Sequence, residues 1–255
     1  MNNQYIKICS DLEALGLHYG DSVLVHSSYK ALGYEGSDGI KTFIDALRDV
    51  LGKDGTLLLP SLSYSTVNRA RPFFDIRSTP CCVGAIPEFF RQLPGVKRSL
   101  SPTHSVCGIG RLTFEMLSEH QLDDTPCGSH SPFKKLMETE GKILLCGCGT
   151  KPNTSMHAVE ETVMPYYLFG PRITYHCTDE NGKQIDITNL RHNFSGHSLL
   201  QRYDRLIDVL SNDDYSSGKI LNADSWLIQT VPMWKKAADK MRIEEEFFVQ
   251  KESEK

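Results

Sequence analysis

Hydrophobic runs long enough to cross a membrane are missing from this sequence. Its longest apolar runs, such as TLLLP and KILLCG, have the length of a strand, whereas a membrane-spanning helix needs about 20 apolar residues. The first residues, MNNQYIKICSDLEALG, also lack the charged-then-apolar pattern of a secretion signal. We therefore expect a soluble, cytoplasmic protein with no membrane partner.

Two further absences concern charge and cysteine spacing. The chain has 28 basic and 32 acidic residues, a formal charge of −4, and no block of basic residues interleaved with aromatic ones. Such a chain is not expected to bind nucleic acid. Its eight cysteines include no C-x-x-C pair, which favours reduced thiols over a disulfide framework or a zinc ribbon.

Several catalytic motifs are also missing. The sequence contains no G-x-x-x-x-G-K-[ST], no G-x-G-x-x-G after a strand, no G-x-S-x-G and no H-E-x-x-H. These patterns are typical of P-loop ATPases, dinucleotide enzymes, α/β-hydrolases and zinc proteases, respectively. All four classes are therefore disfavoured.

A strand–helix–strand unit is the first clear structural pattern that is present. The valine-rich run SVLVHSS, residues 22–28, is typical of a strand buried on both faces. Residues 37–52 place apolar side chains on one helical stripe, with Ser37 or Asp38 as the cap. The run GTLLLP, residues 55–60, predicts a second strand parallel to the first. The class is therefore α/β.

The rest of the chain predicts a single domain over residues 1–255. Residues 61–110 are irregular apart from a helix near IPEFFRQL, and a long segment rich in aromatic, arginine and hydroxyl side chains favours a ligand-lining role. The remaining expected elements are a helix starting at Ser131-Pro132, a strand at 141–149, an antiparallel hairpin at 172–190, a helix at 197–212 and a helix from 232.

Three groups of residues carry possible chemistry. His26, Ser27 and Ser28 lie at the end of the first strand, where backbone N–H groups could hold a phosphate or an oxyanion, or where these side chains merely satisfy the loop. Arg98 with nearby hydroxyls and the Ser131 helix start could grip a diphosphate, or serve as ordinary turn and cap residues.

The third group lies in NTSMHAVEE, residues 153–161. In a helix, His157 shares a side with Glu160 and Glu161 and lies one turn after Thr154. This arrangement fits a proton-handling pair, half of a metal site or a solvated helix face. The other histidines show no ligand-like pairing in the sequence except in HNFSGH, so a metal is not expected.

Taken in order, six segments resemble the aminoglycoside 3-N-acetyltransferase family. They are GDSVLVHSSYKALG, DGIKTFIDALRDVLGKDGTLLLPSLSYS, FFDIRSTPCCVGAIPEFFR, VKRSLSPTHSVCGIG, DDTPCGSHSPFKKL and GKILLCGCGTKPNTSMHAVEE. Together they span roughly residues 20–170. One departure is Ser101, which stands before Pro102 where many relatives have histidine.

The resemblance implies a three-layer α/β/α sandwich with a mixed, partly parallel central sheet and a C-terminal antiparallel hairpin. It also implies acetyl-CoA as cosubstrate and direct acetyl transfer to an amine, with His157, Glu160 and Thr154 as the catalytic block. The expected cofactor residues are His26, Ser27, Ser28, Tyr29, Lys30, Arg98, Ser99, Ser105, Ser131 and Phe133. Tyr64, Asp75 and Glu88 are expected to face the amine.

The expected function is thus acetylation of an aminoglycoside or amino sugar, with His157 as general base. The acceptor could instead be an amino sugar of a surface-polysaccharide pathway. A CoA-binding protein without transfer activity and a metal-dependent hydrolase are the two competing functions. Pairing of two copies as a homodimer stays open.

Overall fold

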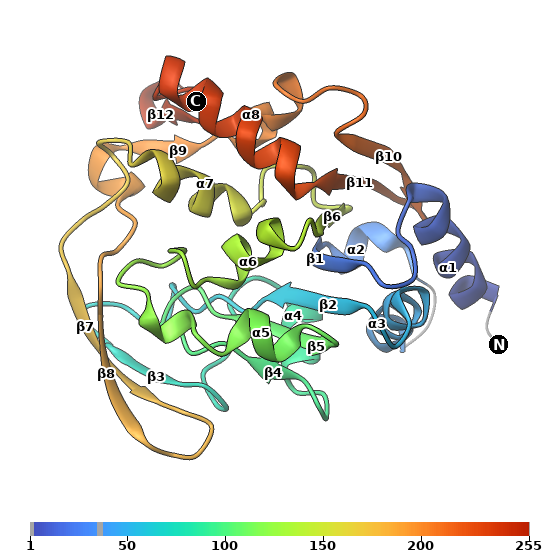
Figure 1. Cartoon of the computed structure of the whole chain (residues 1–255), viewed down its shortest axis with the longest axis horizontal. Coiled ribbons are helices and arrows are strands. Elements are labelled where there is room, and N and C mark those ends of the chain that lie inside the picture. The colour runs from blue at the N-terminus through green and yellow to red at the C-terminus, as the bar shows by residue number, and fades with distance from the viewer. Residues whose placement is uncertain (1–2, 35–37, 255) are drawn as a thin grey trace.

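A seven-stranded mixed β-sheet runs through the centre of the computed structural model, which describes residues 3–34 and 38–254 (Figure 1). Its strands, in spatial order, are β10 (Tyr215–Ile220), β11 (Ala223–Gln229), β6 (Lys142–Cys146), β1 (Ser22–Ser27), β2 (Thr56–Pro60), β5 (Val106–Gly110) and β4 (Lys97–Arg98). The three central strands β6, β1 and β2 are parallel, and every outer pair is antiparallel. The expected mixed, partly parallel sheet is confirmed.

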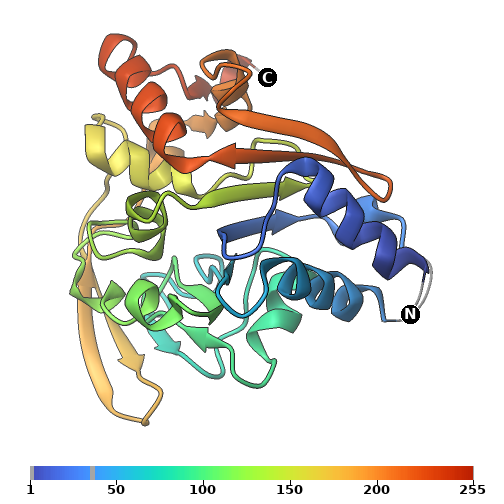
Figure 2. The same cartoon turned by 45° about the vertical axis from the view of Figure 1, so that its right-hand side comes forward.

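Helices cover both faces of this sheet (Figure 2). Because successive strand residues point to opposite faces, Val23 and Val25 pack in one core and Leu24 packs in the other. The first core contains residues of α1 (Asn3–Leu15), α2 (Tyr29–Leu32), α3 (Gly39–Leu51) and α4 (Ala85–Arg91). The second contains residues of α5 (Thr113–Leu117), α6 (Pro132–Glu138), α7 (Ser155–Val163) and α8 (Thr230–Ile243). The three-layer arrangement is confirmed.

The predicted strand–helix–strand unit corresponds to β1, α3 and β2. Phe43, Leu47 and Leu51 of α3 are buried against the sheet, as the apolar stripe predicts. Asp38 occupies the cap position of α3. The other cap candidate, Ser37, lies outside the described residues.

A three-stranded sheet lies beside the central one. The predicted hairpin is present as β7 (Ile173–Thr178) and β8 (Gln184–Asn189), and β3 (Phe73–Asp75) pairs in parallel with β7. The segment 61–110 is therefore more regular than its sequence indicates, since β3, α4, β4 and β5 all lie within it. Two of these strands are only two or three residues long, too short for a periodic signal.

The helix predicted at residues 197–212 is wrong. The chain instead forms the 3₁₀ turns η2 (Phe194–His197) and η3 (Tyr203–Asp208), separated by β9 (Leu199–Gln201). β9 pairs with β12 (Val249–Lys251), and the Arg202 N–H donates to the Phe248 carbonyl. These long-range backbone bonds replace the helical ones, while Tyr203 and Leu206 stay buried as their spacing predicts.

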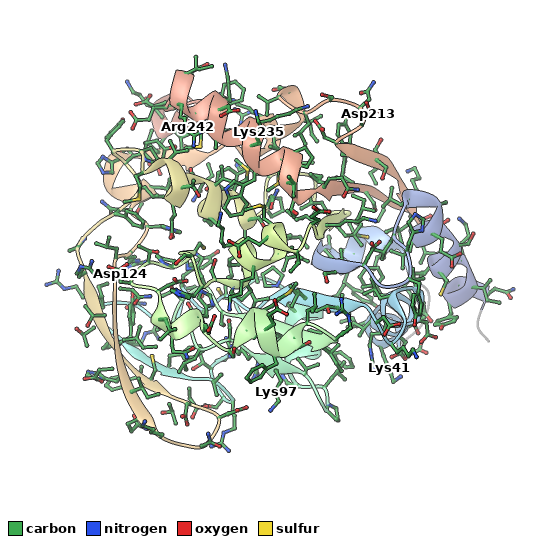
Figure 3. The ribbon with its side chains drawn as sticks, viewed as in Figure 1. Lys41, Lys97, Asp124, Asp213, Lys235 and Arg242 are labelled. Carbon is green, nitrogen blue, oxygen red and sulfur yellow. The ribbon has the colours of Figure 1, made fainter. Side chains whose placement is uncertain are left out.

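Exposed charges of both signs cover the surface (Figure 3). Of the side chains labelled there, Lys41 pairs with an aspartate one turn along α3, Lys97 with Glu180, and Asp124 with Arg172. Such exposed pairs contribute little to stability. In the part of the chain that the structure describes, no helix combines the length and the hydropathy needed to cross a membrane.

Candidate active site

A cavity of about 750 Å³ opens at the carboxyl ends of the three parallel strands. Its wall includes residues at the ends of these strands: His26 and Ser27 of β1, Pro60 of β2, Leu62 just beyond β2, and Cys148 after β6. Ligands of open α/β sheets bind in the crevice beyond these strand ends. The volume lies within the range of small-molecule sites, about 300–1,000 Å³.

A second cavity, of about 560 Å³, lies between α1, α3 and the amino end of β2. Tyr5, Arg48, Asp49 and Lys53 line it, together with apolar and glycine residues. Neither a histidine nor a cysteine is among its lining residues. Of these two cavities, only the first is lined by histidine side chains.

His157 projects from α7 into the first cavity. Its Nδ1 lies 3.3 Å from Oε2 of Glu160 and 2.9 Å from the Tyr203 hydroxyl, which itself donates to the same carboxylate oxygen at 2.6 Å. A tyrosine hydroxyl has one hydrogen, so the oxygen of Tyr203 accepts from Nδ1–H of His157. This arrangement leaves the Nε2 lone pair of His157 free.

The carboxylate beneath His157 is fully buried. Burial raises the pKa of Glu160, while hydrogen bonds from His157, Tyr203 and Tyr167 oppose the rise. Burial and the nearby Glu160 also raise the pKa of Tyr203 well above its ordinary value, so the phenol keeps its proton and remains a donor. The side chain of His157 is 13% exposed and reaches the cavity.

The start of α7 is fixed by the turn after β6. Gly147 has φ +68°, and a Cβ on it would lie 2.5 Å from the Cβ of Ala31, so the turn requires glycine there. Thr154 occupies the cap position and lines the cavity, and its carbonyl accepts from the His157 N–H at 3.0 Å. Its hydroxyl makes no capping bond.

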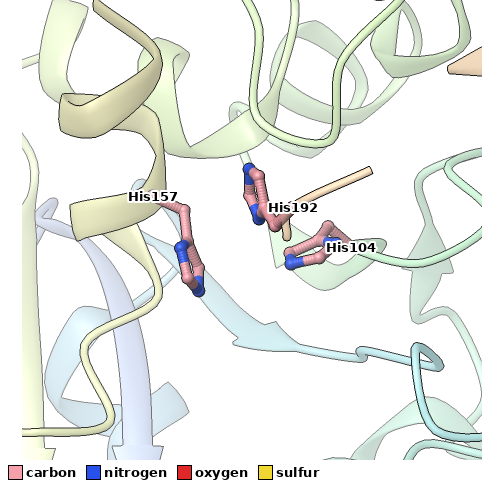
Figure 4. A group of neighbouring side chains, drawn as sticks. All are labelled: His104, His157 and His192. Carbon is pink, nitrogen blue, oxygen red and sulfur yellow. The ribbon is translucent and has the colours of Figure 1, made fainter. Parts of the chain in front are cut away.

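Two further histidines, His104 and His192, lie beside His157 (Figure 4). Their ring centroids are 5.6 Å and 4.6 Å from that of His157 and 5.0 Å from each other. Burial holds the pKa of both well below the ordinary value, so both are neutral. Nε2 of His192 lies 2.8 Å from Glu161, whose pKa burial raises to about 7.

Sequence reasoning missed this cluster because its members are about 35 to 90 residues apart in the chain. His104 lies in the loop before β5, His157 in α7, and His192 in the segment after β8. The feature of the sequence that pointed to this cluster was Glu161, which lies on the same side of the helix as His157 and anchors His192. The sequence did not indicate its partner.

The expected cofactor loop is only partly exposed to the cavity. His26 and Ser27 line it, and Nε2 of His26 and Oγ of Ser27 are buried without a hydrogen-bond partner among the described residues. Burial lowers the pKa of His26 to about 3, so the ring is neutral. Ser28, Tyr29 and Lys30 are not among the lining residues, because the chain turns into α2.

Arg98, which was expected to grip phosphate, is not among the residues that line the cavity. Its guanidinium donates to the carbonyls of Ser61, Ile76 and Thr79 and to Oγ of Ser105, and it stacks over Phe74. The hydroxyl of Ser105 in turn donates to the Ser61 carbonyl. Both side chains therefore hold neighbouring loops together.

Removing this guanidinium should destabilise the protein. Arg98→Ala removes the donor to the partly buried carbonyls of Ile76 and Thr79, each loss costing about 1–3 kcal/mol, so we expect the free energy of unfolding to fall by about 3 kcal/mol. Arg242→Ala, at an exposed arginine, is the control and should change it by less than about 0.5 kcal/mol. Denaturant unfolding of both variants measures the difference, and equal values would contradict the structural role of Arg98.

The other expected cofactor residues also have structural roles. Ser99 accepts from the Val106 N–H and contacts Nδ1 of His120 at 2.9 Å. Ser131 caps α6, as predicted, by accepting from the Lys134 N–H, and Phe133 is buried in the core. None of Ser99, Ser131 and Phe133 is among the cavity-lining residues.

Of the three residues expected to face the amine, only Tyr64 lines the cavity, where its ring is 6.2 Å from that of His104. Asp75 accepts from the backbone N–H groups of Arg77 and Ser78, which help to lower its pKa. Glu88 binds Arg91, which lowers the pKa of the carboxyl to about 2. These local bonds already occupy both carboxylates.

Ser101, the departure from the family pattern, is buried in the loop that carries His104. Its hydroxyl is 3.4 Å from the His104 N–H, and Thr103 Oγ1 lies 2.9 Å from Nδ1 of the same histidine. Ser101 therefore supports the backbone next to the cluster.

Comparison with known proteins gives a consistent family match. The sequence profile of the aminoglycoside 3-N-acetyltransferases matches residues 24–242. Aminoglycoside N(3)-acetyltransferase VIII of Streptomyces fradiae is 33% identical, and the match covers 60% of this chain and 59% of that protein. This chain therefore spans less than two thirds of the length of that relative. Aminoglycoside N(3)-acetyltransferase IX of Micromonospora chalcea is 27% identical, and the match covers 89% of this chain and 89% of that protein.

Among solved structures, a variant of the aminoglycoside acetyltransferase AAC(3)-IVa in complex with gentamicin has a TM-score of 0.80. It is 27% identical, and the match covers 96% of this chain and 90% of that one. The likeness extends over all layers of the fold rather than a single segment.

Proposed function

The chain belongs to the aminoglycoside 3-N-acetyltransferase family, and on that premise we propose that it transfers an acetyl group from acetyl-CoA to an amine of an aminoglycoside or another amino sugar. The observation that carries this proposal is the free Nε2 of His157, directed into the cavity while Glu160 and Tyr203 hold Nδ1. A base held in this way can activate an amine for attack on a thioester.

In the proposed reaction, His157 acts on the substrate amine directly. The amine is largely protonated near neutral pH, and Nε2 of His157 takes the proton that it must lose. The nitrogen then attacks the thioester carbonyl carbon, the C–N bond forms, the C–S bond breaks, and the CoA sulfur leaves as a thiolate. The new amide nitrogen gives its surplus proton to the thiolate, and the imidazolium of His157 releases its proton to solvent. Glu160 stabilises the imidazolium that forms and, with Tyr203, fixes its orientation.

The negative charge that develops on the thioester oxygen needs a hydrogen-bond donor to stabilise it. The N–H of Ser28, in the turn after β1, already donates to the Cys146 carbonyl at 2.9 Å. Ser27 Oγ and His26 Nε2 are better placed, since both are buried at the cavity wall without a partner among the described residues. We assign the oxyanion contact to these two side chains.

The charges of the cavity wall support a second candidate acceptor, an amino sugar that carries a phosphate or a nucleotide. Lys151 and Arg191 line the cavity, whereas Glu252 is the only aspartate or glutamate among its lining residues in the described part of the chain. Aminoglycosides are polycations and gain little from such a wall. An acceptor with one amine and an anionic group fits these charges better.

A panel of acceptors tests both candidates. The protein is incubated with acetyl-CoA and either gentamicin, glucosamine, glucosamine phosphate or a nucleotide-linked amino sugar, and release of the CoA thiol is measured. Turnover with any of these amines, confirmed by mass of the N-acetylated product, supports the transferase. CoA binding in calorimetry without turnover on any amine would favour a binding protein instead. The ranking of gentamicin against the phosphorylated sugars separates the two acceptor classes.

A further inference from the structure

The three histidines at the inner wall of the cavity face one another (Figure 4). One ring nitrogen of each lies within 4.8 Å of one from each of the others. We propose that His104, His157 and His192 form a binding site for a divalent late-transition-metal ion, with Zn²⁺ as the expected occupant.

Each ring is anchored through one nitrogen, as metal-binding histidines usually are. Nδ1 of His157 is held by Glu160 and Tyr203, and Nε2 of His192 by a carboxylate oxygen of Glu161 at 2.8 Å. Nδ1 of His104 is held at 2.9 Å by the hydroxyl of the preceding residue. Each ring therefore keeps the other nitrogen for a ligand.

The free nitrogen of His192 is the independent indication of a ligand. Nδ1 of this ring is buried and has no hydrogen-bond partner among the described residues. Leaving a buried polar atom unpaired is unfavourable, and a metal–nitrogen bond would remove that cost. His104 and His157, whose rings also keep one free nitrogen, line the cavity as His192 does.

The type of donor selects the metal. Three neutral imidazoles suit zinc, copper or nickel, whereas magnesium and calcium prefer oxygen ligands. In a tetrahedral site with Zn–N bonds of about 2.0–2.1 Å, the nitrogens are about 3.3 Å apart. One nitrogen of each ring already lies within 4.8 Å of one from each of the others, so a closure of about 1.5 Å brings nitrogens at that separation to the spacing of a zinc site. The fourth position faces the cavity and can hold water or a ligand.

A metal ion bound to Nε2 of His157 would occupy the lone pair that takes the proton. Zinc would then inhibit acetyl transfer rather than assist it. This consequence rests on the proposed function, whereas metal binding itself does not. The binding experiment is therefore carried out without acetyl-CoA or an acceptor.

Calorimetric titration of the full chain with Zn²⁺ tests the site, after removal of metals with a chelator and with a metal-free reductant to keep the cysteines as thiols. The variants are His104→Gln and His192→Gln. His176→Gln is the matched control, because His176 is likewise anchored by a carboxylate, that of Asp186, but is exposed and outside the cluster. Titration with Co²⁺ in parallel reports nitrogen coordination through its visible absorption.

We expect one equivalent of Zn²⁺ to bind the parent chain and the His176 variant, with affinity at least tenfold lower in both cluster variants. Thr103→Val keeps all three ligands but removes the anchor of His104. It should weaken binding by about 10–100-fold, so the test survives if a cluster variant fails to fold. Absence of stoichiometric binding to the parent chain, or equal affinity in all variants, would overturn the proposal.

Discussion

Replacing His157 with alanine should lower the rate of acetyl transfer by about 10²–10⁴-fold, the usual contribution of a general base. The affinity for CoA should change little, because the base acts on the amine and not on the cofactor. Turnover and CoA binding are measured separately, by thiol release and by calorimetry. The loss should appear in kcat more than in the KM for acetyl-CoA.

The control for this change is His176→Ala, at a histidine outside the cavity that also pairs with a carboxylate. It should retain parental turnover. Added imidazole should restore part of the activity of His157→Ala, because the truncation leaves room in the cavity for a small base. Near-normal turnover by His157→Ala would refute the assignment of the base.

Glu160→Gln should reduce turnover by about 100-fold or more while leaving the protein at least as stable as its parent. The amide cannot offset the positive charge that forms on His157, so the base loses its electrostatic support. Burial disfavours the carboxylate of Glu160 in the folded state, and a neutral amide avoids that cost. We therefore expect kcat to fall while the melting temperature stays the same or rises.

Glu180→Gln provides the matched control, since Glu180 forms an exposed ion pair with Lys97. Neither turnover nor melting temperature should change noticeably there. If Glu160→Gln keeps parental turnover, the carboxylate does not support the base. A fall of several degrees in its melting temperature would instead show that Glu160 stabilises the fold.

The parts of the fold that could be predicted are those with strong local patterns. Valine-rich β1, the apolar stripe of α3 and the Ser131-Pro132 start of α6 each depend on a few adjacent residues. The pairing of His157 with Glu160 was predictable for the same reason, because helical spacing alone brings the two side chains together.

The rest of the site depends on contacts between distant segments. His104 and His192 come to His157 from different loops, and Tyr203 from a 3₁₀ turn where the apolar spacing had predicted a helix. The carbonyl contacts of Arg98 were not predictable either, because a planar donor fork suits backbone carbonyls as well as phosphate, and only tertiary packing brings those carbonyls into range. Sequence periodicity carries no information on such contacts.

The pairing of β9 with β12 also determines at what stage of synthesis the chain can hold His157 in its final orientation. All seven strands of the central sheet have been synthesised once residue 229 has left the ribosome. The strand that holds the backbone next to Tyr203 is residues 249–251. The sheet can therefore form while the phenol beside His157 is still unanchored, and a segment translated later completes the orientation of His157.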